Sequence, residues 1–176
     1  MINAFETPRL RLRKAAESDL ELIWRRVWSD AGLAEKMLWT PTETLEDAKK
    51  RMERTIAYQT AYHAFFVCLK ESNEPIGFAG FREIRRGEYE ESGVCIAKAW
   101  QGHSYGKETL SALVEIAFEH LGGWRFVCGC FHDNLPSAGT IKSCGFVYTH
   151  SEDRVRQHDG YPYQCDFYER IRSHEP

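Results

Sequence analysis

One amphipathic helix between two β-type segments constrains the fold of this chain more than any other feature. From Tyr105 onward apolar residues recur at helical spacing and form one buried stripe, made of Leu110, Leu113, Val114, Ala117 and Leu121. β-rich runs at 92–97 and 124–131 flank this helix. The pattern predicts a strand–helix–strand crossover, which places its two strands in parallel.

The rest of the chain predicts antiparallel strands around this crossover. Short turns join the β-rich runs at 63–69, 76–84 and 92–97, which indicates a meander. Further strands are expected at 10–13, 146–155 and 161–171, and helices from about 44–60, at 136–144, and after Ser18 and Glu21, which have capping-box spacing. We therefore expect one α/β domain of the α+β type over residues 7–171, with the element order β-α-α-β-β-β-α-β-α-β-β.

Composition excludes several classes of protein. A formal net charge of -3 argues against a general nucleic-acid binder. No apolar run approaches the roughly 20 residues of a membrane helix, and the N-terminus lacks a hydrophobic signal segment, so we expect a cytoplasmic protein without membrane contact. The six cysteines have no metal-ligand spacing, so we expect reduced, buried thiols and no metal.

The turn from Gly102 to Lys107 opens the amphipathic helix and suggests an anion site. It is not a nucleoside-triphosphate loop, because three residues rather than four separate Gly102 from Gly106 and Glu108 follows the lysine. A strand end, a glycine turn and a helix start nevertheless present unpaired N–H groups that suit a pyrophosphate. A plain β-to-α turn, with glycine used for tightness, explains the same residues equally well.

Two segments together resemble the GNAT family of acetyl-CoA-dependent N-acetyltransferases, especially its RimJ/RimL-like branch. Residues 91–108 look like the family's strand and Q/R-x-x-G-x-G/A loop, with Gln101, Ser104 and Gly106 in the defining places. Residues 134–146 are similar to its N-x-x-S helix ending in Gly-Phe, and residues 6–13 to the branch's first strand. Ser104 stands where the family usually has glycine, and Ile141 where many relatives carry a tyrosine.

The resemblance implies a GNAT fold, with a mixed, mostly antiparallel sheet of about seven strands flanked by about four helices. It implies direct acetyl transfer from acetyl-CoA, without a metal, to a primary amine on a protein N-terminus or a small molecule. A GNAT-fold module that binds acyl-CoA without turnover is the alternative. The cofactor contacts that the resemblance implies are Val94, Cys95, Ile96, Gln101, Gly102, His103, Ser104, Tyr105, Gly106, Lys107, Asn134 and Ser137.

Acetyl transfer needs a neutral amine, and a lysine-like amine has a pKa of about 10.4, so a base or a water chain is expected. Glu91 is the first candidate and Glu90 the second, although the acidic run at 88–91 is also typical of a solvated turn. Ser137 or Tyr148 are candidates for protonating the departing thiolate. Asn134 and Ser137 equally suit the start of a helix.

The acceptor is less constrained by the sequence. In relatives the first two helices commonly form the acceptor wall, so Trp24, Trp28, Trp39 and Tyr62 are candidates for it. A cationic acceptor is suggested by the acidic residues Glu83, Glu88, Glu90, Glu91, Asp159 and Asp166. We expect no nucleic-acid partner and either a monomer or a homodimer.

Overall fold

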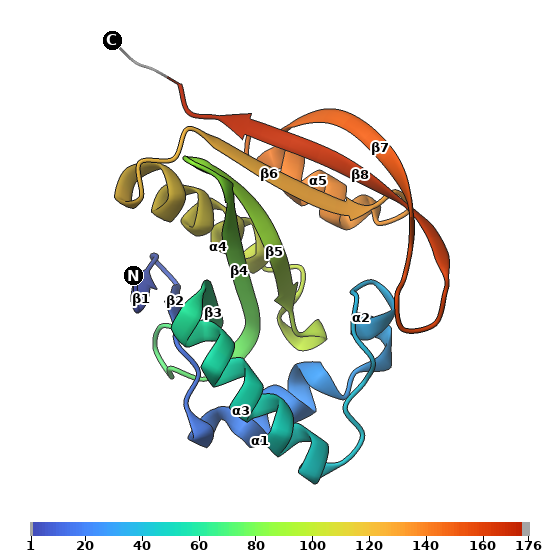
Figure 1. Ribbon diagram of the computed structural model, residues 1–176. Helices are drawn as coiled ribbons and strands as arrows, with labels where there is room; N and C mark the ends of the chain where they lie inside the picture. Colours follow the sequence, from blue (N-terminus) through green and yellow to red (C-terminus); the bar gives the residue numbers. More distant parts are fainter. Residues whose placement is uncertain (1, 174–176) are drawn as a thin grey trace.

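A computed structural model describes residues 2–173, which form one eight-stranded sheet with helices on both faces (Figure 1). The strand order across the sheet is β1-β2-β3-β4-β5-β6-β8-β7. The strands are β1 (Ala4–Glu6), β2 (Leu10–Arg13), β3 (His63–Leu69), β4 (Pro75–Arg85), β5 (Glu88–Ile96), β6 (Arg125–Phe131), β7 (Val147–Val155) and β8 (Pro162–Ile171).

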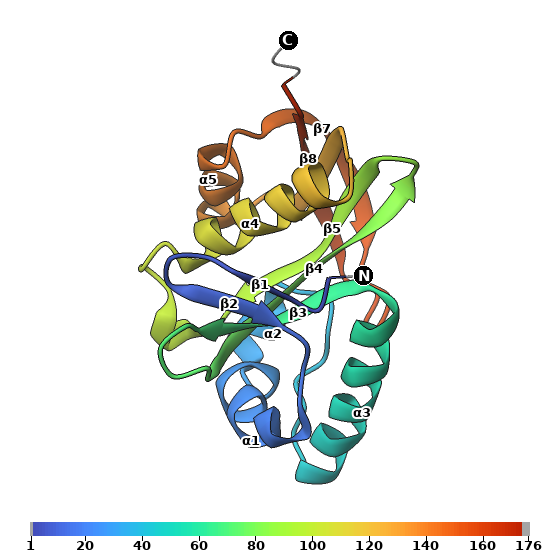
Figure 2. The ribbon, with the colours of Figure 1, turned by 90° about the vertical axis from the view of Figure 1, so that its left-hand side faces the viewer.

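The helices separate into two groups. Helices α4 and α5 lie together near β6, whereas α1 and α3 lie at the opposite end of the molecule (Figures 1 and 2). The α-helices are α1 (Leu20–Ile23), α2 (Ala31–Glu35), α3 (Leu45–Ala61), α4 (Tyr105–Glu115) and α5 (Leu135–Ser143). A π-helical turn extends α1 through Trp24–Trp28, and another extends α4 through Ile116–His120.

The sheet divides the core into two layers, and strand β3 contributes side chains to both. Successive residues of a strand point to opposite faces, so Phe65 and Val67 pack with the α4 and α5 side. Phe66 and Cys68 pack with the side formed by α1, α2 and α3. This strand is buried on both faces, which explains its continuous apolar run in the sequence.

The sheet divides between β5 and β6, the pair joined by the crossover. These strands run parallel and pair only through Glu88–Glu90 with Arg125–Val127. Beyond this point β5 remains bonded to β4 and β6 to β8, so the two strands diverge (Figure 1). Arg125 braces the closed end by ion pairs with Glu88 at 2.7 Å and Glu169 at 2.8 Å. We call the opening between β5 residues 91–96 and β6 residues 128–131 the fork.

Most predicted elements are confirmed, including the meander, the parallel crossover and the closing hairpin. The strand count of about seven was one short, because β1, with only three residues, is too brief to give a pattern. The short helix α2 was also missed. The first helical segment begins at Glu17, with Ala16 rather than Ser18 at its N-cap, and the Asp19 carboxylate accepts from the Ala16 amide at 2.9 Å. Strand β5 begins at Glu88, four residues before the predicted start at 92.

The described residues bear on the expectations about metal ions, thiols and the membrane. Within residues 2–173, no group of three or more His, Cys, Asp or Glu side chains is arranged to hold a metal ion. All six cysteines are free and buried. None of the helices described is long and apolar enough to cross a membrane.

Candidate active site

Strand β5 directs backbone groups into the fork at alternate residues. The Ala97 amide donates to the Ile76 carbonyl at 2.8 Å, which places the backbone N–H and C=O groups of Cys95 and Ala97 toward β4. The backbone N–H and C=O groups of Val94 and Ile96 must then face the fork. The Gln101 side chain agrees with this, because its Nε2 donates to the Ile96 carbonyl at 2.9 Å. Val94 therefore offers an N–H and a carbonyl to a ligand lying between the strands.

Glu91 lies at the closed end of the fork. The register between β4 and β5 shifts beside it, so that Ser92 is an extra residue between the pairs of Glu91 and Gly93. The Glu91 carboxylate accepts hydrogen bonds from the backbone amides of Gly93 on β5 and Gly129 on β6, which lower its pKa. Burial opposes them and has the larger effect, so the pKa of Glu91 rises to about 7.

The loop before α4 presents backbone amides as the sequence predicted. Gly102 has φ of +80°, and Ser104, at the N-cap of α4, has φ of +63°. Serine thus adopts the left-handed backbone for which the family uses glycine. Among the described residues the amides from Gly102 to Lys107 have no backbone acceptor in the loop or the cap. A Cβ built on Gly106 would meet only the Thr140 side chain, at 4.0 Å, so there is room beside this amide for a ligand.

The N-terminal segment holds this loop in place. Arg9 donates to the His103 carbonyl at 3.0 Å and forms an ion pair with Glu108 in the first turn of α4 at 2.7 Å. The Thr7 hydroxyl donates to the same carboxylate at 2.6 Å. The His103 ring turns back to the Gln101 carbonyl at 2.9 Å, and Lys107 is exposed. These contacts fix the helix start before any ligand binds.

The start of α5 contributes Asn134 and Ser137. The Asn134 side-chain oxygen caps the helix by accepting from the Ser137 amide at 3.3 Å. Its NH₂ group has no partner within residues 2–173 and is free to donate. The Ser137 hydroxyl hydrogen-bonds the Cys130 thiol of β6. Ile141, in the place of the family's tyrosine, is buried in the core.

Two predicted residues are not brought to the fork by their side chains. The Cys95 thiol points into the core between the sheet and α1–α3, where burial raises its pKa to about 12. A covalent acyl-enzyme at this thiol is therefore excluded. Tyr148 lies on the outer strand β7, with β8 and β6 between it and β5, and its hydroxyl bonds to Ser151 at 2.9 Å. The prediction of an acid at Tyr148 finds no support in this arrangement.

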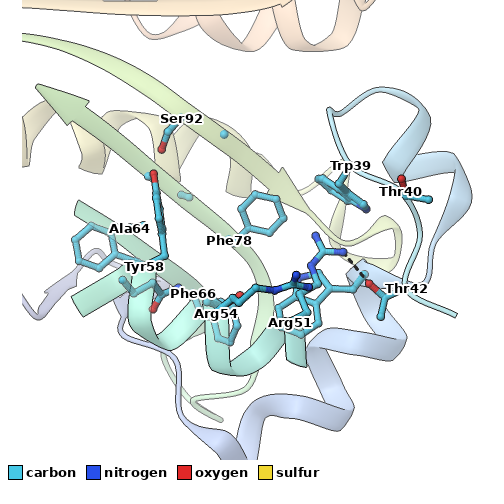
Figure 3. A pocket seen from close by; sticks show the side chains of 17 residues that line it. Trp39, Thr40, Thr42, Arg51, Arg54, Tyr58, Ala64, Phe66, Phe78 and Ser92 are labelled. Atoms are coloured by element: carbon cyan, nitrogen blue, oxygen red, sulfur yellow. Dashed lines mark hydrogen bonds between the residues drawn. The ribbon is translucent and has the colours of Figure 1, made fainter. Parts of the chain in front are cut away.

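A cavity of about 530 Å³ opens between α3, the segment before it and strands β3, β4 and β5 (Figure 3). It reaches Ser92 and Gly93, beside Glu91 on β5. Seventeen residues line it, namely Trp28, Trp39, Thr40, Thr42, Arg51, Arg54, Thr55, Tyr58, Gln59, Ala64, Phe65, Phe66, Phe78, Ala79, Gly80, Ser92 and Gly93. None of them is acidic.

None of the acidic residues suggested for the acceptor lines this cavity. Glu91 is the chain neighbour of the lining residue Ser92, and the other acidic side chains are engaged elsewhere. Glu83 accepts from the Gly87 amide, and the others pair as Glu88 with Arg125, Glu90 with Arg82, Asp159 with Arg156, and Asp166 with His132. Of the aromatic candidates, Trp28 and Trp39 line the cavity, whereas Trp24 bonds the Thr42 carbonyl and Tyr62 stacks on Tyr58.

Sequence reasoning missed the residues that give this cavity its charge. Arg51, Arg54 and Tyr58 recur at i, i+3 and i+7 along α3 and therefore share one face of the helix. A search for polar residues at helical spacing beside the buried Met52 would have found them. No sequence pattern identifies Ser92, because a β-bulge depends on the register between two strands and not on the residues of one strand.

Comparison with solved structures agrees with the fold. A crystal structure of a GNAT-family acetyltransferase from Bacillus anthracis superposes with a TM-score of 0.84 at 19% identity, covering 96% of this chain and 98% of that one. RimL, a ribosomal-protein acetyltransferase solved with coenzyme A, gives 0.79 at 23% identity, with coverage of 96% and 98%. The microcin C7 self-immunity acetyltransferase MccE, solved with acetyl-CoA and AMP, gives 0.80 at 18% identity, with coverage of 94% and 94%.

A search of curated protein sequences gave no match. The model of the acetyltransferase (GNAT) domain matches residues 9–147, which include α3, the fork, the loop before α4, the whole of α5 and all seventeen residues of the cavity lining. The chain therefore belongs to the GNAT acetyltransferase family.

Proposed function

We propose that this protein transfers an acetyl group from acetyl-CoA to a primary amine by direct attack, as the RimJ/RimL-like branch does. The observation that carries the proposal is the juxtaposition of Glu91, the free backbone groups of Val94 and the cavity that reaches Ser92. Membership of the family and the solved relatives that hold coenzyme A or acetyl-CoA support it.

The residues present suit the cofactor. The amides from Gly102 to Lys107 form the cradle proposed for the diphosphate, with the α4 helix start behind them. The groups of Val94 and the NH₂ of Asn134 are proposed to bond the amides of the pantetheine arm. A bulky or charged side chain introduced at Gly106 would occupy the space beside this amide and would exclude the cofactor.

When bound, acetyl-CoA supplies the acetyl group as a thioester. The neutral amine attacks the carbonyl carbon, so that a C–N bond forms, the C–S bond breaks and one proton leaves the nitrogen. Glu91 is proposed to receive this proton directly or through water, since a carboxylate whose pKa is about 7 is about half ionised at neutral pH. The Val94 N–H is proposed to polarise the carbonyl.

The departing thiolate needs little help. The thiol of coenzyme A has a pKa near that of cysteine, about 8.5, so the thiolate leaves readily and takes a proton from solvent, either directly or relayed through the Ser137 hydroxyl, which regains its proton from water. A dedicated acid at the place of Ile141 is therefore dispensable.

Thiol release measured over a panel of amines, with acetyl-CoA as the donor, tests this function. We expect saturable release that depends on the amine and yields the N-acetyl product by mass spectrometry. Acetyl-CoA binding by calorimetry without release for any amine would instead identify a module that binds but does not turn over.

A further inference from the structure

We propose that the acceptor is a small amine that also carries a carboxylate or phosphate group, which Arg51 and Arg54 bind in the cavity described above. This proposal rests on the acetyl transfer proposed for the fork and names the class of its acceptor.

The two arginines leave positive charge without a counter-ion at the cavity. Both side chains extend from α3 into the same region, below Trp39 and Phe78 (Figure 3). Among the described residues neither of them forms an ion pair, although most of the other arginines do. Burial, with the neighbouring Arg54 charge second, lowers the pKa of Arg51 to about 10, so the Arg51 charge is poorly solvated and lies near a second positive charge. An anion bound between the guanidinium groups relieves it.

Arg51 is also held in position before a ligand binds. Its Nη1 donates to the Thr42 hydroxyl at 2.9 Å, and its guanidinium carbon lies 4.8 Å from the Trp28 ring centre and 5.2 Å from that of Trp39. The Thr42 amide donates to the Trp28 carbonyl at 2.8 Å, which anchors this segment to the first helical region. Arg54 is exposed and can adjust to the ligand. One guanidinium held by Thr42 and one exposed guanidinium suit the oxygens of a carboxylate or a phosphate.

The other walls accept the apolar part of such a molecule. Trp39 and Phe78 meet edge to face with ring centres 5.4 Å apart and form an aromatic corner above the arginines (Figure 3). At the opposite end of the cavity Tyr58 and Ser92 point toward one another from α3 and β5 (Figure 3). A molecule whose anion meets the arginines can therefore direct its amine toward Ser92 and the fork. Polyamines and aminoglycosides carry only positive charges, so the positive charges of Arg51 and Arg54 disfavour their binding.

Matched pairs of amines test this inference through kcat/KM for thiol release. The pairs are L-phenylalanine with 2-phenylethylamine, and O-phosphoethanolamine with ethanolamine, so that carboxylate and phosphate are compared separately. We expect the anionic member of at least one pair to be used at least tenfold better. The Arg54→Gln variant should lose at least tenfold in kcat/KM for that member and less than twofold for its partner without the anionic group, with the KM for acetyl-CoA unchanged.

Arg25→Gln is the matched control, because Arg25 is exposed and paired with Glu21 outside the cavity. Arg54 is exposed, so its replacement tests the site without the risk to folding that Arg51→Gln carries. Equal use of both members of each pair, or an Arg54→Gln variant that behaves like Arg25→Gln, would overturn the inference and leave acetyl transfer standing.

A binding measurement separates failure of the inference from failure of acetyl transfer. N-acetyl-L-phenylalanine and N-acetyl-2-phenylethylamine are titrated by calorimetry, which requires no turnover. Tighter binding of the anionic compound, lost in Arg54→Gln, supports the arginine site even if no amine releases thiol. Equal binding of the two compounds to the unaltered protein counts against it.

Discussion

Glu91 shows how a single carboxyl group acquires a pKa suited to neutral pH. It stands where β5 and β6 separate, and amides from both strands donate to it, yet burial keeps its pKa at about 7. Glu90, the other candidate base, is instead held by Arg82 at 2.6 Å. The two neighbours in the acidic run therefore differ in environment, and the raised pKa of Glu91 suits a group that exchanges a proton near physiological pH.

Replacing Glu91 by Gln should change the pH dependence of both stability and rate. Because the pKa of Glu91 is raised in the folded state, the folded protein binds more protons than the unfolded chain between about pH 4.5 and pH 7. The free energy of unfolding should therefore fall as pH rises through this window, by roughly 1–3 kcal/mol. Glu91→Gln should lack this fall in denaturant titrations at pH 5 and pH 8.

In rate measurements, Glu91→Gln should lower kcat at least tenfold and lose the ionisation near pH 7 from kcat/KM. Glu90→Gln is the matched control and should retain both pH profiles. A Glu91→Gln enzyme with an unaltered profile would exclude Glu91 as the base.

At the scale of elements, two helix starts meet the proposed cofactor site. Helix α4 presents its first amides beside Gly106, and α5 presents Asn134, whose oxygen caps the helix while its NH₂ is free. At α4 the N-cap residue is Ser104, whereas the amide proposed to bind the ligand is that of Gly106. At α5 the side-chain oxygen of Asn134 caps the helix, whereas its NH₂ group is proposed to bind the ligand. Substitutions can therefore separate folding from binding.

Asn134→Asp should keep the cap and remove only the free donor. We expect its free energy of unfolding to stay within about 0.5 kcal/mol of wild type, while the KM for acetyl-CoA rises at least threefold. Asn134→Ala should raise this KM similarly and also cost about 1 kcal/mol of stability. The comparison needs denaturant titration and initial rates. Wild-type KM in Asn134→Asp would show that the residue only caps α5.

Gly106→Ala should strengthen α4 and weaken cofactor binding. Alanine favours a helix over glycine by roughly 0.5–1 kcal/mol, and the added Cβ meets nothing closer than Thr140 at 4.0 Å, so stability should not fall. The Kd for acetyl-CoA by calorimetry should rise several-fold, and that of Gly106→Glu at least tenfold. Gly77→Ala is the opposite case, because its Cβ would lie 2.0 Å from the Cys95 carbonyl oxygen, and it should impair folding. Unchanged acetyl-CoA affinity in both Gly106 variants would place the diphosphate elsewhere.

For the whole molecule, periodicity was enough to predict the meander, the crossover and the closing hairpin, because each depends on patterns within one segment. The cofactor contacts at 94–96, beside the fork, were anticipated only through the resemblance to a family. The cavity was not predicted, since it depends on contacts among α3, the segment at 39–42 and the bulge at Ser92. The ion pairs of Arg125 with Glu88 and Glu169 also join distant segments, and no local pattern reveals them.

The two core layers on either side of β3 have a consequence for how such a protein changes over time. The loop at 101–107 belongs to the α4 side, whereas Arg51, Arg54 and Trp39 belong to the α3 side, and the sheet stands between them. With the amine in the cavity and coenzyme A at the loop, as proposed, mutations that change which amine is accepted can accumulate on the α3 side without altering the cofactor contacts on the α4 side. We therefore expect a descendant with a new acceptor to retain coenzyme A binding throughout the transition.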